Sequence, residues 1–146
     1  MAGCDERELR AWESRSLTGC LYDYQRNTDA VCSLLVQDDA SILAKVTAKA
    51  NLNINTLGVF SSMIFATSQM LVREIGSEGE VLGRINLGPS YYLLVMSVTP
   101  MVALVTLGKR PFAEGLLEHQ ARAMMPRIIN CLAHPSREDQ RINDHG

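Results

Sequence analysis

Few side chains in this sequence are spaced in a way that would support chemistry. Cys131 and His134 are three residues apart, a spacing that zinc sites use. A structural zinc site needs four ligands, however, and this pair supplies only two. Asp38 and Asp39 are adjacent carboxylates that could hold a cation, although such a pair between two strands is more typical of a turn. We therefore predict no metal site, no cofactor and no catalytic residues.

The other reactive or phosphate-binding patterns are equally incomplete. The four cysteines (Cys4, Cys20, Cys32 and Cys131) form no CxxC pair, and none has an identifiable base nearby, so we expect buried, reduced thiols. The run 83–90 has Pro89 where a phosphate-binding loop would have its lysine. Lys109 and Arg110 could meet an anionic partner, but a solvated loop is the more common explanation.

Length and composition indicate one soluble domain. The chain has 146 residues, of which 47% are hydrophobic and 21% charged, and this excludes disorder for most of its length. A net charge of -2 and an aromatic content of only 5% argue against a dedicated nucleic-acid binder. The charged N-terminus does not resemble a secretory signal, and no apolar run is long enough to span a membrane. We expect a cytoplasmic protein.

The spacing of apolar residues predicts an α-β-β-α-β-β-β-α order in a single α/β (α+β) domain. The capping pattern of Asp5 and Glu8 predicts a helix from 5 to about 25. We expect strands at 30–37 and 41–48, a long helix at 54–75, and strands at 80–87, 91–98 and 101–107. A last helix follows Pro111, and Pro126 should kink or split it. The predicted domain is 1–133, with 134–146 a disordered tail.

Two features of this pattern bear on how the domain packs. The strands at 30–37, 91–98 and 101–107 are apolar on both faces and belong inside a covered sheet, whereas 41–48 and 80–87 are mixed and belong at its edges. The helix at 54–75 has no charged residue from 54 to 72. A surface helix normally carries charges on its outer side, so we expect the outer face of this one to be covered as well.

This order of elements resembles the Roadblock/dynein light chain domain, of the profilin-like and longin-like folds. The resemblance covers about 17–132, and it rests on the hairpin 31–44 (VCSLLVQDDASILA) and on the end of the meander, 102–108 (VALVTLG). It implies a five-stranded, mainly antiparallel sheet with the central helix on one face and the terminal helices on the other. The first, fourth and fifth strands would lie inside. The family usually has Asp-Gly in the first turn, where this chain has Asp39 and Ala40.

The resemblance also implies a function. Members are non-enzymatic dimeric scaffolds, and the bacterial GTPase-regulator (MglB-like) type acts on a small Ras-like GTPase. Two protomers pack their central helices antiparallel and join their third strands. If Leu57, Phe60, Ile64 and Leu71 pack on the sheet, the candidates for the dimer interface are Val59, Ser62, Met63, Thr67 and Met70 on the helix and Val81, Gly83 and Ile85 on the third strand. The sequence leaves open which of the two helix sets faces the sheet. No arginine finger is identifiable, so such a regulator would act by shifting the switch loops of its partner.

Other functions stay open at this point. A ligand-sensing module of the PAS or GAF kind has similar elements and would enclose a cavity inside the protomer. A scaffold would instead show a filled core and an exposed apolar helix. A small enzyme, for which no residues can be named, and a role in cytoskeletal transport would both be compatible with this sequence.

Overall fold

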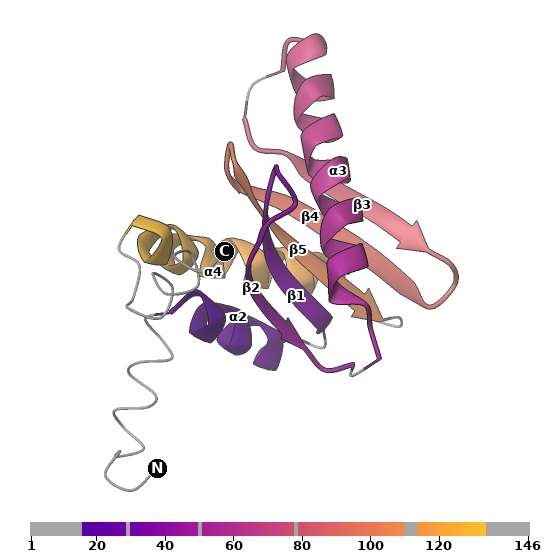
Figure 1. Cartoon of the computed structure of the whole chain (residues 1–146), viewed down its shortest axis with the longest axis vertical. Coiled ribbons are helices and arrows are strands. Elements are labelled where there is room, and N and C mark those ends of the chain that lie inside the picture. Colours follow the sequence, from indigo (N-terminus) through magenta and orange to yellow (C-terminus); the bar gives the residue numbers. More distant parts are fainter. Residues whose placement is uncertain (1–15, 29, 50, 78, 110–113, 134–146) are drawn as a thin grey trace, which may run out of the picture.

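The computed structural model describes residues 16–28, 30–49, 51–77, 79–109 and 114–133. The elements follow the predicted order (Figure 1): α2 (Leu17–Arg26), β1 (Ala30–Gln37), β2 (Ile42–Thr47), α3 (Ile54–Glu74), β3 (Leu82–Leu87), β4 (Tyr91–Thr99), β5 (Val102–Lys109) and α4 (Glu114–Ala133). The predicted α+β class is confirmed. The predicted tail, 134–146, lies outside the described residues.

The five strands form one antiparallel sheet in the order β2-β1-β5-β4-β3. β1, β4 and β5 are inside and mostly buried, because both of their faces carry apolar side chains. β2 and β3 are the edges, and their side chains are largely half-buried or exposed. Both the inner position of the first, fourth and fifth strands and the polar character of the edges are as predicted.

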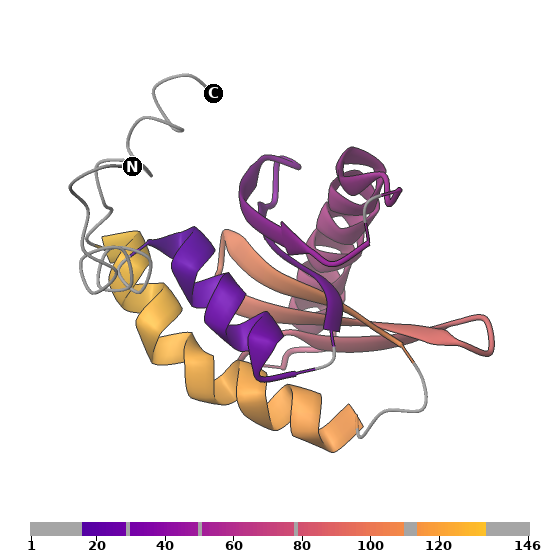
Figure 2. The same cartoon turned by 90° about the horizontal axis from the view of Figure 1, so that it is seen from below.

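Helices cover both faces of the sheet (Figure 2). α3 lies on one face, over a cluster that includes Leu34, Phe65, Val95 and Val105. α2 and α4 lie side by side on the other face. Their cluster joins side chains of both helices to the sheet: Cys20, Tyr24, Leu35, Leu104, Leu117, Ile128 and Cys131. The alternation of side chains along each inner strand thus supplies one core above the sheet and a second below it.

Helix α2, the first helix of the described residues, has its own N-terminal cap. Ser16 has extended backbone angles, and its Oγ accepts a hydrogen bond from the Gly19 amide at 2.8 Å, which makes Ser16 the N-cap of α2. The predicted start at Asp5 lies outside the described residues. Ser16 followed by Leu17 is an equally good start signal, which the capping-box spacing upstream obscures.

The sequence singled out one turn and one helix-internal proline, and the structure accommodates both. The β1–β2 hairpin turns through Asp38, Asp39 and Ala40, and Ala40 has a φ of 74°, a left-handed conformation that usually falls to glycine or asparagine. Asp39 Oδ1 accepts from the Ser41 amide at 2.9 Å and fixes the turn. In the last helix, Pro126 is accommodated without splitting the element, since α4 continues from Glu114 to Ala133.

Candidate protein interface

Small and polar residues fix the position of helix α3 on the sheet, in addition to the apolar contacts that its inner side makes with the sheet cluster. Asn53 caps its N-terminus by accepting from the Thr56 amide at 3.1 Å. At Gly58 a Cβ atom would come within 2.9 Å of Ile42 Cδ1, so the helix crosses β2 closely there. Ser62 Oγ donates to the carbonyl oxygens of Gln37 at 3.1 Å and Asp38 at 3.2 Å. α3 is thereby fixed against the β1–β2 hairpin in one rotational setting.

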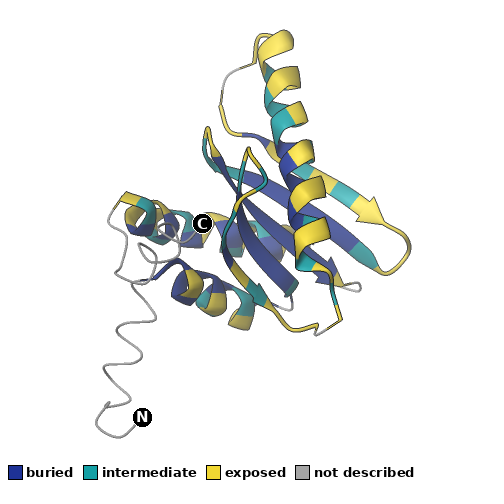
Figure 3. Cartoon of the chain, in the orientation of Figure 1, coloured by how far each residue is buried: buried dark blue, intermediate teal, exposed yellow. Residues whose placement is uncertain are grey.

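That setting leaves a row of large apolar side chains facing outward. We call it the α3 face, and it consists of Val59, Phe60, Met63, Met70 and Leu71, with Thr67 between them. Phe60, Met63, Met70 and Leu71 are 59%, 58%, 63% and 59% exposed, respectively. The exposed surface runs along the whole helix in Figure 3. These positions recur at helical spacing, so they form one continuous stripe rather than scattered residues.

The α3 face carries no charge. Between residues 54 and 72 the chain has no Asp, Glu, Lys or Arg, and charged side chains return only at Arg73 and Glu74, at the end of the helix. Single exposed apolar residues are ordinary in soluble proteins, but a contiguous uncharged row is typical of a surface that another protein covers. Long charged side chains that could shield such a row are missing from this stretch of the sequence.

The structure brings some of the predicted interface residues together and separates others. Val59, Met63, Thr67 and Met70 all lie on the exposed side of α3. Ser62, in contrast, is only 3% exposed and faces the hairpin, as its two hydrogen bonds require. Ser62 is therefore a positioning residue of the protomer and not part of its outer surface.

The helix residues that were expected to pack on the sheet divide in the same way. Leu57 and Ile64 do pack against the sheet cluster. Phe60 and Leu71 do not, because both belong to the exposed α3 face, so the structure decides an assignment that the sequence left open. The signal that identifies the inner side is the set of small residues Gly58, Ser61 and Ser62, which mark where a helix can approach a sheet closely.

The third strand forms one edge of the sheet, beside β4. Val81 precedes β3, is buried, and exchanges hydrogen bonds with Ser97 on β4. Gly83 and Ile85 are half-buried within β3, and Ile85 packs against the α3-side cluster. Of the predicted strand residues, Gly83 and Ile85 thus remain near the edge, whereas Val81 is a core residue of the protomer.

Ion pairs tie this edge to the helix on the opposite face. Arg84 of β3 pairs with Glu118 of α4, and Arg122 of α4 pairs with both Glu118 and Glu80. These charges occupy the α4 side of β3, so they leave the α3 side apolar. The ion pairs to α4 thus hold the edge strand β3 in place. One backbone edge of β3 has no neighbouring strand within the sheet and can pair with another chain.

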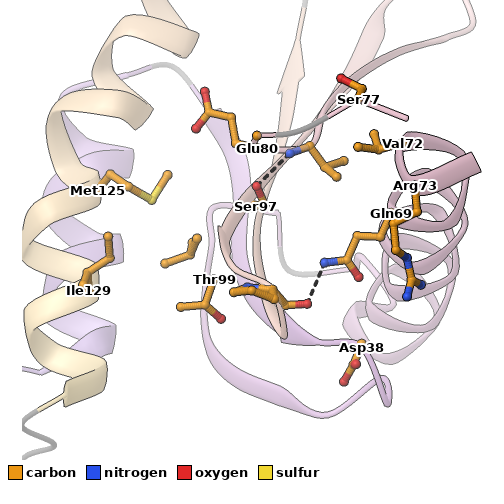
Figure 4. Close-up of a pocket in the computed structure, with 14 residues that line it drawn as sticks. Asp38, Gln69, Val72, Arg73, Ser77, Glu80, Ser97, Thr99, Met125 and Ile129 are labelled. Carbon is orange, nitrogen blue, oxygen red and sulfur yellow. Dashed lines mark hydrogen bonds between the residues drawn. The ribbon is translucent and has the colours of Figure 1, made fainter. Parts of the chain in front are cut away.

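A groove of about 660 Å³ opens at the end of the sheet between α3 and α4 (Figure 4). Gln69 and Arg73 line it from α3, Met125 and Ile129 from α4, and the β4–β5 turn closes its floor. Gln69 Nε2 donates to the Pro100 carbonyl oxygen at 2.6 Å across this floor. A sensory domain would enclose its ligand inside the protomer, whereas this groove is walled by exposed residues such as Arg73.

The cysteines that the structure describes and the aspartates that the sequence offered for chemistry lie in the core and in a turn, respectively. Cys20, Cys32 and Cys131 are buried thiols, and burial raises the pKa of Cys32 to about 11. Hydrogen bonds from Ser41 lower the pKa of the Asp39 carboxyl, as the turn geometry requires. Among the described residues, no three His, Cys, Asp or Glu side chains are placed to hold a metal ion. His134, the proposed partner of Cys131, lies outside them.

Comparisons with known proteins add the identity of the fold. No family model matches the sequence, and no curated protein matches it either. Among solved structures, Myxococcus xanthus MglB superposes with a TM-score of 0.73 at 14% identity, covering 80% of this chain and 94% of that one. A Roadblock/LC7 domain from Streptomyces avermitilis gives 0.72 at 13% identity, covering 81% and 98%. The chain has the Roadblock/LC7 fold.

A third similar structure is an MglB with a tetrameric arrangement, which has a TM-score of 0.66 at 19% identity and covers 77% of this chain and 84% of that one. With identities this low, the likeness extends to the Roadblock architecture and not to individual residues. The suspected Roadblock resemblance is therefore confirmed at the level of the fold. In the described part of the chain, no helix is both long and apolar enough to cross a bilayer.

Proposed function

We propose that this protein is a homodimeric, non-enzymatic scaffold or regulator that binds a small Ras-like GTPase. The α3 face carries the proposal: it is a continuous, uncharged apolar row on a protomer whose other apolar side chains are mostly buried. A second copy of the chain is the occupant that this surface fits best, because an isologous dimer places the same apolar face against itself. The tetrameric arrangement of one similar MglB supports self-association of this fold.

In the proposed dimer, Val59, Met63, Thr67 and Met70 meet their counterparts across the two-fold axis. Phe60 and Leu71 join this set, since they belong to the same exposed face. The edge strand adds Gly83 and Ile85, which lie on the α3 side of the sheet. Ser62 and Val81, which the sequence had also suggested, act within the protomer instead.

The GTPase part of the proposal follows from the Roadblock fold. Ras-like GTPases hydrolyse GTP through their own phosphate-binding loops, and a partner can change that rate by moving the switch segments. Two copies of this chain would present a surface composed of both protomers on which such a partner can bind. We place the protein in the cytoplasm, where these GTPases act.

Two measurements test these two parts separately. Light scattering at micromolar concentration should give about twice the chain mass of 16.1 kDa, and a monomer would reject the dimer. Each small Ras-like GTPase of the source organism should then be assayed with and without this protein. A changed rate of GTP hydrolysis or nucleotide exchange for one of them is expected. Unchanged rates together with no binding, for every GTPase tested, would reject the regulator.

A further inference from the structure

Two cysteines face each other on the side of the sheet opposite α3. Cys20 belongs to α2 and Cys131 to α4, and 111 positions of sequence separate them. Their Sγ atoms are 3.4 Å apart in the packed contact between the two helices. Both side chains are members of the same buried cluster. Their helices, α2 and α4, lie on the face of the sheet opposite α3 (Figure 2).

A disulfide bond brings two sulfurs to about 2.05 Å, so these atoms need to approach by roughly 1.4 Å more. The two side chains already point at each other across the α2–α4 contact, so the bond requires only a further approach of the sulfurs. We propose that Cys20 and Cys131 are a redox-active dithiol site, whose substrate is a low-molecular-weight disulfide such as oxidised glutathione. Oxidation links α2 to α4 covalently.

The reaction proceeds by two thiol–disulfide exchanges. The Cys131 thiolate attacks one sulfur of oxidised glutathione, a mixed disulfide forms, and one glutathione thiolate leaves and takes up a proton. The Cys20 sulfur then attacks the Cys131 sulfur, loses its own proton, and expels the second glutathione. The two cysteines lose two electrons in total and the glutathione disulfide gains them.

Burial determines which sulfur reacts first and how fast. Cys20 is completely buried, and burial together with the neighbouring Cys131 raises its pKa to about 12. Few Cys20 thiolates therefore exist at neutral pH, and Cys20 is a poor first attacker. Cys131 lies within the last turn of α4, which ends at Ala133, and helix ends open more readily than helix centres. The site responds slowly, to sustained rather than brief oxidation.

The bond would restrain one wall of the groove. The C-terminal half of α4 carries Cys131 and also Met125 and Ile129, which line the groove in Figure 4. The salt bridge between Arg127 and Asp23 already holds the same half of α4 against α2, with 3.0 Å between its atoms. A covalent link next to it would reduce the opening of this wall. α3 lies on the other face, so self-association should be the same in both redox states.

The test uses a Cys4→Ser/Cys32→Ser variant, in which Cys20 and Cys131 are the only thiols left. The folded variant is incubated with oxidised glutathione and then denatured in the presence of N-ethylmaleimide, which alkylates the remaining thiols. The mass of the intact chain is then measured by mass spectrometry. We expect a monomeric chain that has lost two hydrogens, carries no adduct, and returns to the dithiol with dithiothreitol. The matched Cys20→Ser chain in the same background should stop at the glutathione adduct of Cys131.

A second measurement avoids dependence on the variants. Wild-type protein treated in the same way and digested should yield a peptide pair joined through Cys20 and Cys131, and its thermal midpoint should rise relative to the reduced form. Two maleimide-labelled cysteines at positions 20 and 131 after prolonged incubation would overturn the proposal. A stable glutathione adduct in place of the internal bond, in the chain that retains both thiols, would overturn it equally.

Discussion

The charge-free α3 face makes Met63→Glu the most informative single substitution. Met63 is 58% exposed in the protomer and lies near the middle of the α3 face. In the protomer alone, the introduced carboxylate would remain in water and cost little. In the proposed dimer, two copies of this carboxylate would enter an apolar contact that contains no basic side chain between 54 and 72. The substitution should therefore weaken association without unfolding the chain.

The magnitude follows from the exposed part of Met63. Burying a whole methionine side chain contributes about 1.5–3 kcal/mol. Since somewhat more than half of Met63 is exposed in the protomer, the substitution removes about that fraction of this free energy from the dimer for each of its two copies. Desolvating an unpaired carboxylate costs several kcal/mol more, unless the group takes up a proton. A loss of at least about 4 kcal/mol per dimer is a conservative sum, and it corresponds to a dissociation constant roughly a thousandfold higher.

Sedimentation equilibrium of three variants separates this effect from a general one. Met63→Leu keeps an apolar side chain of similar volume, and its dissociation constant should stay within about tenfold of wild type. Leu116→Glu places the same charge at a site that is 46% exposed on α4, on the opposite face of the sheet, and should change association by no more than about twofold. If Met63→Glu associates as tightly as Leu116→Glu, the α3 face is not the dimer interface.

Three substitutions test the packing of the protomer through urea unfolding at a fixed protein concentration. Gly108→Ala should destabilise by about 1–3 kcal/mol, because its Cβ would lie 2.6 Å from the ring of Tyr92; an unchanged midpoint would contradict that contact. Ala40→Gly should stabilise by up to about 1 kcal/mol by relieving the left-handed backbone, and a loss of stability would refute the turn conformation. Tyr24→Phe should cost about 1 kcal/mol, since the Tyr24 hydroxyl is 2.8 Å from Thr106 Oγ1 in the core; no loss would mean that this bond adds nothing.

The sequence predicted the order of elements well because apolar periodicity reports burial on each face. β1 matched its predicted range, and α3 differed only at its last residue. The polar edges and the apolar inner strands gave the sheet positions directly, since a strand covered on both faces needs apolar side chains on both. Helix ends are harder to predict than helix centres. The sequence has capping residues at both Asp5 and Ser16, and Ser16 is the one that caps α2.

The exposed side of α3 was harder to predict, because a helix that is apolar all round does not reveal its rotation. The sequence left the choice of face open; the structure places Met63 and Met70 outward, as one of the two sets required, and adds Phe60 and Leu71 to the exposed side. Rotation depends on close approaches such as Gly58 to Ile42, which join residues far apart in sequence. The proximity of Cys20 and Cys131 could not be predicted for the same reason, because no local sequence pattern indicates that α2 and α4 lie side by side.

Oxidative footprinting of the methionines tests most directly whether a second copy covers the α3 face. Met63, Met70 and Met101 are 58%, 63% and 59% exposed in the protomer, so they should react with hydroxyl radicals at similar rates if the chain is monomeric. Met101 belongs to the β4–β5 turn and not to the α3 face. We predict that Met63 and Met70 are protected at micromolar concentration while Met101 reacts, and that dilution removes the protection. Equal rates at all three methionines at every concentration would contradict the dimer.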